Sequence, residues 1–492
     1  MEAVKCKGLS FTYPKTEYPA LKDVSFTVER GELCVVIGES AAGKSTLLKL
    51  LKKEIAPHGE ISGEISVSGS AAYVAQNIEE SIVCNKVRHE LAFALSNEGK
   101  SEEEIELAVA QTASYFNLDR KLDFDVSALS DGEKQLLNLA AVMINNPDIL
   151  VLDEPASRLD PVSAMRFVDI IKKMHRDLGT TIIIAEHNTN ALIESANSIM
   201  LLEDAKLLIK SDVESCVEYM KQNESDMLSS LPVQMRLYDG AKTIAECAEI
   251  FKTKNITPIK DNSALGETAL EVKNIYFAYE KGKDILSALS LKVYKGKINA
   301  VLGPNSSGKT TLLKNIAGVH KPYRGKIKSN AKISMLCQNP LDLFTKERCG
   351  DEVSFGSITD FLGISEIENR HPYDLSGGQA QRLALAKVLE KNADIILLDE
   401  PTKGLDPVLK DKLAQILREL CERGKTILIV SHDIDFISQH CDVSSFLSGG
   451  KIIATMKRRE FFSSLTLYTS AVAKITKTNI VSIKDLEESG GI

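Results

Sequence analysis

Glycine-rich segments that end in a lysine and a hydroxyl residue occur twice in this chain. Both follow the pattern Gly-x4-Gly-Lys-[Ser/Thr], come after an apolar run typical of a strand and precede a run with helical periodicity. In that context the glycines let backbone N–H groups wrap phosphates, and the helix presents its positive N-terminus to them. We expect phosphate loops formed by Gly38, Ala41, Ala42, Gly43, Lys44, Ser45 and Thr46, and by Gly303, Ser306, Ser307, Gly308, Lys309, Thr310 and Thr311.

Two apolar runs, Ile149–Asp153 and Ile395–Asp399, are each followed directly by a glutamate. Because ligands collect at the carboxyl ends of parallel strands, these carboxylates should arrive beside the phosphates. We expect Glu154 and Glu400 to act as general bases that polarise the attacking water. The expected ligands of Mg²⁺ on this edge are Ser45, Asp153, Thr310 and Asp399.

A histidine recurs in the same register, as His187 and His432, each at the end of a β-branched run. A single histidine in such a place is more often structural. Its repetition in register, after the corresponding β-branched run of each half, favours contact with the γ-phosphate. The remaining repeats pair Phe11-Thr12-Tyr13 with Phe277-Ala278-Tyr279, Gln76 with Gln338, and Leu129–Glu133 with Leu375–Gln379.

An α/β core has to position these residues. Leu33–Ile37, Asp148–Leu152 and Thr181–Ala185 have the length and composition of buried parallel strands, and Gln135–Ile144 has helical periodicity. Strands that alternate with helices in this way indicate a mostly parallel sheet. We therefore predict an α/β fold with two such domains in tandem.

The repeats also indicate the limits of these domains. We expect a first domain over residues 1–225, a polar, proline-marked connector over 226–267, a second domain over 268–470 and a tail over 471–492. The interval from Gln76 to Ser130 is longer than that from Gln338 to Ser376. Only the first contains an acid-started amphipathic segment, Ser101–Thr112, which is typical of a helix N-terminus.

The composition is that of an ordinary globular protein: 492 residues, 43% hydrophobic, with a formal net charge of −8. This charge gives no general attraction to nucleic acid, and we expect no nucleic-acid partner. The nine cysteines are scattered, which favours reduced thiols in the cytosol over a disulfide framework or a metal site. The apolar runs are strand-sized, so we expect no membrane span.

The order of these motifs resembles that of the ATP-binding cassette (ABC) ATPases over nearly the whole chain. The resemblance implies, for each half, a β-subdomain and a helical subdomain beside the core. It implies that Tyr13 and Tyr279 stack on adenine and that Gln76 and Gln338 touch Mg²⁺. It also implies that the two cassettes pair over two ATP molecules, with Leu159-Asp160 and Leu405-Asp406 communicating between the sites. The elements that would complete the opposite site contain Ser130, Gly132, Ser376, Gly377 and Gly378.

The segments after the two glutamines resemble those of energy-coupling-factor (ECF) transporter ATPases. They are Gln338–Phe344 with Asp351–Gly356, and Gln76–Val83 with His89–Phe93. This resemblance implies a peripheral subunit on the cytoplasmic face of the membrane, bound to a transmembrane T-component and a substrate-binding S-component that import a vitamin or metal ion. The alternatives are a twin-cassette sugar importer ATPase and a soluble ribosome-associated ABC ATPase.

The two expected sites differ in their closing elements. Ser376-Gly377-Gly378-Gln379 would complete the site of Lys44, Glu154 and His187. Ser130-Asp131-Gly132-Glu133 would complete the other site, where two carboxylates replace a glycine and a glutamine. If these point inward they repel the γ-phosphate and slow that site. If they point away, the backbone amides do the binding.

Overall fold

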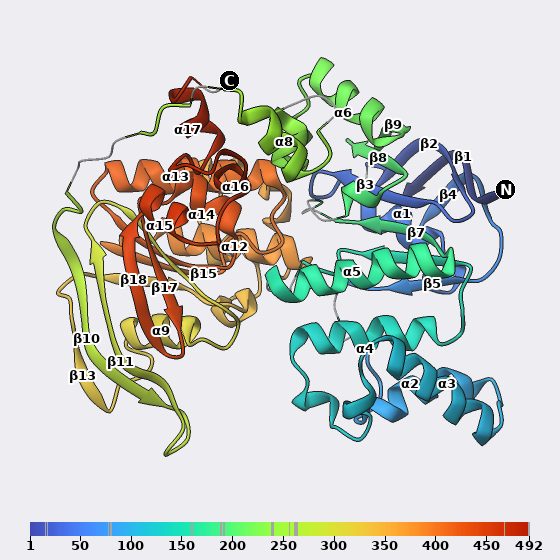
Figure 1. Cartoon of the computed structure of the whole chain (residues 1–492), viewed down its shortest axis with the longest axis horizontal. Coiled ribbons are helices and arrows are strands. Elements are labelled where there is room, and N and C mark those ends of the chain that lie inside the picture. The colour runs from blue at the N-terminus through green and yellow to red at the C-terminus, as the bar shows by residue number, and fades with distance from the viewer. Residues whose placement is uncertain are drawn as a thin grey trace. The chain divides into compact units, whose positions relative to one another are not determined.

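The computed structural model describes residues 1–490 except 15, 17, 77, 79, 80, 158, 160, 187, 188, 190, 191, 238–240, 255, 260–263 and 467, and leaves out the side chain of residue 161. The described chain forms two compact units, Met1–Pro232 and Val233–Ile492. Both units are α/β, with the same order of strands and helices through their cores (Figure 1). This confirms the predicted fold class.

A six-stranded sheet in the order β5-β6-β7-β3-β8-β9 forms the centre of the first unit. β3, β6 and β7 are wholly buried and mostly apolar, apart from Thr181 at the start of β7 and Asp153 at the end of β6, as expected for strands covered on both faces. All pairings are parallel except that of β8 with β9. The strands are β3 (Leu33–Gly38), β5 (Ala71–Val74), β6 (Ile149–Asp153), β7 (Thr181–Ala185), β8 (Ser198–Glu203) and β9 (Lys206–Ser211).

A smaller antiparallel sheet, β2-β1-β4, packs over the P-loop side of this unit through a shared apolar core. The helices α2 and α3 lie at the far end of the unit from it (Figure 1). The strands are β1 (Glu2–Thr12), β2 (Leu21–Glu29) and β4 (Glu60–Val67). The α-helices are α1 (Lys44–Leu50), α2 (Val87–Asn97), α3 (Glu102–Tyr115), α4 (Asp131–Met143), α5 (Pro161–Leu178) and α6 (Val213–Gln222).

The second unit repeats this arrangement, with sheets in the order β14-β15-β16-β12-β17-β18 and β11-β10-β13. Its strands are β10 (Thr268–Ala278), β11 (Asp284–Tyr294), β12 (Ile298–Leu302), β13 (Arg324–Lys328), β14 (Ile333–Leu336), β15 (Ile395–Asp399), β16 (Thr426–Val430), β17 (Val443–Ser448) and β18 (Lys451–Lys457). Its core helices are α9 (Lys309–Ile316), α10 (Cys349–Glu352), α11 (Ser357–Phe361), α12 (Gly377–Glu390), α13 (Pro407–Glu422), α14 (Ile434–His440) and α15 (Arg458–Ser464).

The helical regions of the two units differ in length. In the first, α3 begins after Ser101, whose side chain forms a capping box with Glu104, so the predicted helix N-terminus is confirmed. In the second, the corresponding interval contains only the short helices α10 and α11 among its described α-helices. The predicted absence of a counterpart of α3 from this interval, which is described throughout, is therefore confirmed.

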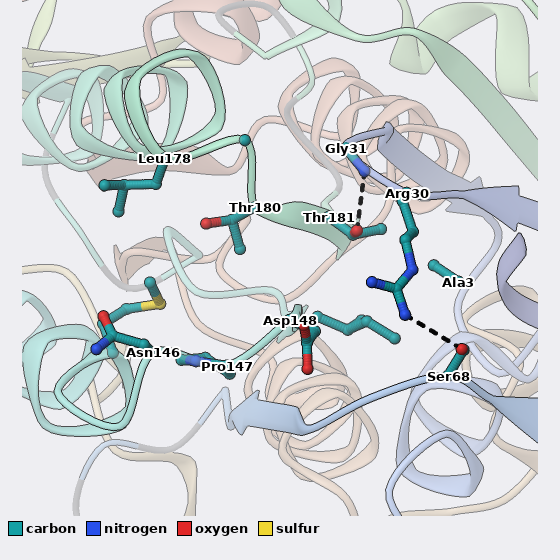
Figure 2. Close-up of a pocket in the computed structure, with 13 residues that line it drawn as sticks. Ala3, Arg30, Gly31, Ser68, Asn146, Pro147, Asp148, Leu178, Thr180 and Thr181 are labelled. Carbon is teal, nitrogen blue, oxygen red and sulfur yellow. Dashed lines mark hydrogen bonds between the residues drawn. The ribbon is translucent and has the colours of Figure 1, made fainter. Parts of the chain in front are cut away.

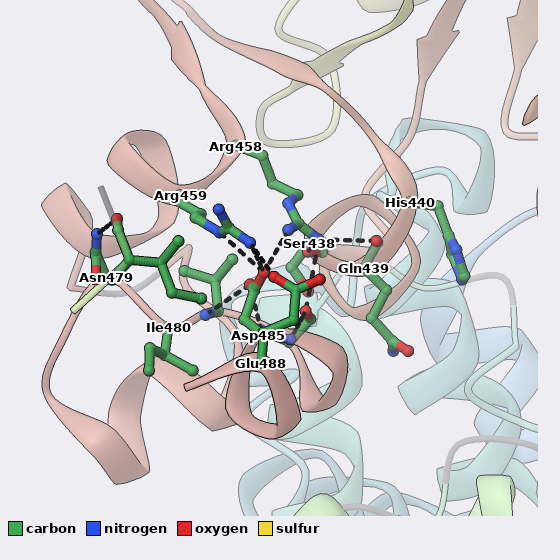
Figure 3. A network of polar contacts seen from close by, with 12 residues as sticks. Ser438, Gln439, His440, Arg458, Arg459, Asn479, Ile480, Asp485 and Glu488 are labelled. Atoms are coloured by element: carbon green, nitrogen blue, oxygen red, sulfur yellow. Dashed lines mark hydrogen bonds and ion pairs between the residues drawn. The ribbon is translucent and has the colours of Figure 1, made fainter. Parts of the chain in front are cut away.

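Residues from the expected connector and tail share one apolar core in the second unit. α7 (Val233–Leu237) and α8 (Ile244–Phe251) lie near α16 (Ala471–Thr476), and Cys247, Phe251, Ile475 and Leu486 are buried together. The last helix, α17 (Ile483–Glu488), is fastened by its buried Asp485, which accepts hydrogen bonds at 2.6 Å from both Arg458 and Arg459 (Figure 3). These contacts hold the end of the chain on the second unit.

Candidate functional site

Both glycine-rich loops contain residues with a left-handed backbone at corresponding positions. Ala41 and Ser306 have φ of 69° and 60°, and the glycines that precede α1 and α9, Gly43 and Gly308, have φ of 97° and 104°. A Cβ on Gly43 would lie 2.3 Å from the carbonyl oxygen of Ala20, so only glycine fits there. Loops of this kind followed by a helix N-terminus are anion-binding concavities.

The loop lysines are buried and folded back over their own loops. Lys44 Nζ donates to the carbonyl oxygens of Gly38 (2.7 Å) and Glu39 (2.8 Å), and Lys309 Nζ makes the same pair of bonds to Gly303 and Pro304 (2.9 and 3.0 Å). The ammonium groups therefore lie at the mouth of each loop, where a phosphate would meet them.

The two tyrosines expected to meet adenine are anchored at the start of the loop helices. The hydroxyl of Tyr13 lies 3.1 Å from Thr46 Oγ1, and that of Tyr279 lies 3.4 Å from Thr311 Oγ1. Each ring also packs edge-on against a phenylalanine of the strand that precedes it. The predicted aromatic residues are thus placed beside the predicted phosphate loops.

The strand-end aspartates lie beside the loop hydroxyls, but their surroundings differ. Asp153 accepts hydrogen bonds from Ser45 Oγ (3.0 Å) and from the Tyr73 hydroxyl (2.9 Å). Both carboxylate oxygens of Asp399 are buried; the Thr310 hydroxyl interacts with this carboxyl, but no donor of the described chain reaches it with full hydrogen-bond geometry. Burial raises the pKa of the Asp399 carboxyl to about 6, although the Thr310 hydroxyl lowers it, and burial also raises the pKa of Asp153. A buried carboxylate beside a threonine hydroxyl suits a hard cation with oxygen ligands.

The glutamates that follow these strands have left-handed backbones, with φ of 46° at Glu154 and 50° at Glu400. Such strain at a non-glycine residue is typical of functional sites. Gln76 Nε2 donates to Glu154 Oε2 at 2.7 Å, which brings together two predicted residues of the first site. Among the described residues no corresponding hydrogen bond joins Gln338 to Glu400, so the role of Gln338 is assigned from its position alone.

His432 lies against Glu400, with its Nδ1 2.9 Å from Oε1. Glu400 also accepts a hydrogen bond from Ser431 Oγ (2.8 Å) and one from the His432 N–H (3.3 Å). Although burial raises it, these partners hold the pKa of Glu400 below its usual range. The corresponding His187 lies outside the described residues, as does Asp160.

The Leu-Ser-x-Gly elements form the N-termini of α4 and α12. Ser130 and Ser376 cap these helices in capping boxes with Glu133 and Gln379. Glu133 is also ion-paired with Lys121, and although burial raises it, these contacts lower its pKa. Its charge is therefore already paired within its own cassette, whereas Asp131 is exposed at the helix start.

Sequence reasoning missed two neighbours of the predicted site carboxylates. The first is Tyr73, which donates a hydrogen bond to Asp153; the corresponding position on β14 of the second unit is Met335. The second is Ser431, which donates to Glu400; the corresponding position after β7 of the first unit is Glu186. A side-by-side comparison of the two halves at every position, beyond the repeated motifs, would have shown both differences.

One cavity of about 330 Å³ lies away from this site (Figure 2). It opens where β6 and β7 begin, beside Asp148 and Thr181, whereas the carboxylates of the site follow the other ends of these strands. Asp148 is already engaged by Ser70, and Arg30 donates to Ser68 at 3.3 Å. Because this cavity lies at the opposite ends of the strands from the site carboxylates, we assign the nucleotide site from the glycine-rich loops and the carboxyl ends of the strands.

Known proteins match this chain along most of its length. The family model of the ABC transporter matches twice, over residues 21–157 and 286–403. An ABC transporter ATP-binding protein of Bacillus anthracis is 32% identical, with 96% of this chain and 95% of that protein covered. A protein of the same description from Clostridium tetani is 30% identical, covering 81% of this chain and 98% of the relative.

Solved structures share the two-cassette architecture at lower identity. The archaeal ribosome recycling factor aABCE1, solved in complex with the ribosomal stalk protein aP1, superposes with a TM-score of 0.65 at 21% identity, over 93% of this chain and 91% of that one. The RNase-L inhibitor gives 0.63 at 21% identity, over 92% of each chain. These likenesses show the fold alone. The matched family, the relatives and the paired phosphate loops together establish that the chain belongs to the ABC transporter ATP-binding proteins and is a two-cassette ATPase that binds and hydrolyses ATP.

Proposed function

We propose that this chain is the Mg²⁺-dependent ATP-hydrolysing subunit of an ECF-type membrane importer. The geometry of the glycine-rich loops and strand ends supports ATP hydrolysis at each nucleotide site. An exposed apolar surface on the first cassette supports attachment to a membrane partner.

The chemistry follows from the placement of charged and polar groups. The loop amides and the ammonium groups of Lys44 and Lys309 would bind the phosphates of ATP. Glu154 and Glu400 would orient a water molecule and accept its proton as its oxygen bonds to the γ-phosphorus and the bond to ADP breaks. His432 would contact the γ-phosphate from its position on Glu400.

A magnesium ion fits the residues that surround the strand-end aspartates. Ser45 already donates to Asp153, and Asp399 is a buried carboxylate that no donor of the described chain reaches with full hydrogen-bond geometry. We infer that Ser45, Asp153 and Gln76 would hold the ion in one cassette and Thr310, Asp399 and Gln338 in the other. When bound, Mg²⁺ neutralises charge that develops on the phosphate oxygens.

The observation that carries the membrane assignment is a set of exposed apolar side chains around α2. Val83 is 66% exposed and Phe93 is 42% exposed, although the segment that carries Val83 is fixed in place. The buried carboxylate of Glu90 accepts hydrogen bonds from the N–H groups of Val83 (3.0 Å) and Cys84 (2.6 Å). Phe124 is also exposed, and its carbonyl oxygen accepts a hydrogen bond from the Val87 N–H at the start of α2; we propose that it belongs to the same surface.

The same carboxylate clamp exists in the second cassette. Glu352 accepts hydrogen bonds from the N–H groups of Thr345 and Lys346 and pairs with Lys387. A backbone that a buried carboxylate holds in this way beside exposed apolar groups suits the docking of a short amphipathic helix. We propose that a cytoplasmic helix of a transmembrane T-component occupies this surface. No helix in the described part of the chain could itself span the membrane.

The test is affinity purification of the tagged chain from gently solubilised membranes. We expect a polytopic partner to co-purify with the unmodified chain, and Val83→Asp to reduce its yield at least about tenfold, as expected when a charge enters an apolar contact. Ile61→Asp is the matched control, because Ile61 is 55% exposed on β4, away from α2. Recovery of ribosomes in place of a membrane partner, or equal loss with both variants, would contradict the proposal.

A further inference from the structure

The residue that directly follows β7 in the first cassette differs from the residue that follows β16 in the second. Glu400 lies between His432 and Ser431, both from the loop that follows β16. At the position of Ser431 the first cassette has Glu186, which accepts a hydrogen bond from the N–H of Ala156 at 2.8 Å. An ionised carboxylate accepts hydrogen bonds only, so Glu186 in that state could not serve Glu154 as Ser431 serves Glu400.

Among the described residues, the hydroxyl of Ser431 has one acceptor for its proton. The Asp433 N–H donates to Ser431 Oγ at 3.1 Å, so this oxygen is already an acceptor on that side. Its single proton then points to Glu400 Oε2, 2.8 Å away. Ser431 is fully buried, which excludes competition from bulk water. The Glu400 side chain is thereby fixed on one oxygen by Ser431 and on the other by His432.

A half-buried ion pair between Lys410 and Asp433 holds the loop that carries Ser431 in place. Asp433 caps α14 through the Phe436 N–H (3.0 Å), and its other oxygen accepts from Lys410 Nζ at 2.6 Å. Lys410 lies on the first turn of α13, the helix that Asp406 caps. The first cassette lacks both charges, because the residues at the positions of Lys410 and Asp433 are Ala164 and Asn188.

We propose that Ser431 is a positioning residue for Glu400, held in register by the Lys410–Asp433 pair, and that only the second cassette uses this arrangement. The inference rests on the proposed function, because it takes Glu400 as the base. It deepens that function by assigning the two bases different supports. Lys410 lies on α13, the helix that follows the Leu405-Asp406 loop. A movement of this loop would therefore be transmitted to Glu400 through Lys410, Asp433 and Ser431.

The test measures kcat and KM for ATP hydrolysis by the full chain. Glu400→Gln defines the loss that follows removal of this base. Ser431→Ala should cause most of that loss, about tenfold on the turnover that depends on Glu400, with KM within about twofold. Ser431→Thr keeps a hydroxyl and should recover most of the turnover. Ser444→Ala is the matched control, because Ser444 is equally buried on β17 and its Oγ has no hydrogen-bond partner among the described residues.

The outcomes separate the inference from the function on which it rests. An unchanged kcat in Glu400→Gln would contradict the proposed base. A loss in Glu400→Gln with full kcat in Ser431→Ala would overturn the positioning role alone, as would a Ser431→Thr variant no better than alanine. Should Ser431→Ala fail to fold, Lys410→Ala probes the same support one contact further from Glu400 and installs the residue of the first cassette. It should lower kcat about threefold with unchanged KM, and full kcat there would overturn the inference.

Discussion

Replacement of Asp399 by asparagine should stabilise the nucleotide-free second cassette at neutral pH. Asp399 is 1% exposed, and no donor of the described chain reaches its carboxylate oxygens with full hydrogen-bond geometry. Burial raises its pKa to about 6, whereas an aspartate in an unfolded chain has a pKa of about 3.9. Each pKa unit corresponds to about 1.4 kcal/mol, so an ionised Asp399 lowers the free energy of unfolding by about 3 kcal/mol.

The sign of this effect fixes its pH dependence. Because the folded pKa is the higher one, the penalty is absent below about pH 3.9, grows as pH rises and is complete above about pH 6. Asparagine is neutral throughout. The stability of Asp399→Asn relative to the unmodified chain should therefore be about 2 kcal/mol greater at about pH 7.5 than at about pH 4.5. Because the comparison is between two pH values, any pH-independent effect of burying the asparagine amide cancels.

Hydrogen exchange of peptides from β15 and β16, followed by mass spectrometry in EDTA, measures the opening free energy of this region. Asp153→Asn is the matched variant. Asp153 already accepts hydrogen bonds from Ser45 and Tyr73, and asparagine can keep only one of them with the same geometry. The gain in stability from Asp153→Asn should therefore be smaller than that from Asp399→Asn. Equal stability of Asp399→Asn at both pH values would refute the reasoning, because it would mean that the buried carboxylate carries no penalty.

Three further outcomes follow from particular contacts. Asp485→Asn should speed hydrogen exchange in α17 by about 100-fold, because two arginines lose a buried partner; Glu488→Gln, which loses an exposed partner, should change it less than about threefold. Gly43→Ala should weaken binding of a fluorescent ATP analogue to the first cassette by more than about tenfold, since its Cβ would lie 2.3 Å from a carbonyl oxygen. Glu133→Gln should leave kcat within about twofold, because Glu133 is already paired with Lys121; a several-fold rise would instead support repulsion of the γ-phosphate.

The sequence alone predicted the elements that local patterns determine. The glycine spacing identified both phosphate loops, and the short apolar runs identified strands that the structure places in parallel sheets. β6 spans Ile149–Asp153, the apolar run that was predicted to end beside Glu154, and the preceding Asp148, included in the looser range 148–152, lies outside the strand and accepts a hydrogen bond from the Ser70 N–H. The proposed limits of the cassettes, 1–225 and 268–470, stay predictions.

Features that depend on distant residues were not predictable in this way. Ser431 and Lys410 carry no pattern of their own, and they acquire their roles only when α13 and the loop after β16 meet. Lys121 neutralises Glu133 from a turn that no periodicity indicates. The expected connector likewise contains helices whose apolar faces are covered by the last residues of the chain, which are distant in sequence.

The number of ATP molecules bound per chain tests the central claim most directly. A chain with both Glu154→Gln and Glu400→Gln should bind without turnover, and equilibrium dialysis with labelled ATP and Mg²⁺ then counts the sites. We predict two per chain, falling to one when either Lys44→Ala or Lys309→Ala is added. One site in the parent variant, or no loss with either lysine replacement, would contradict an ATPase built on two phosphate loops.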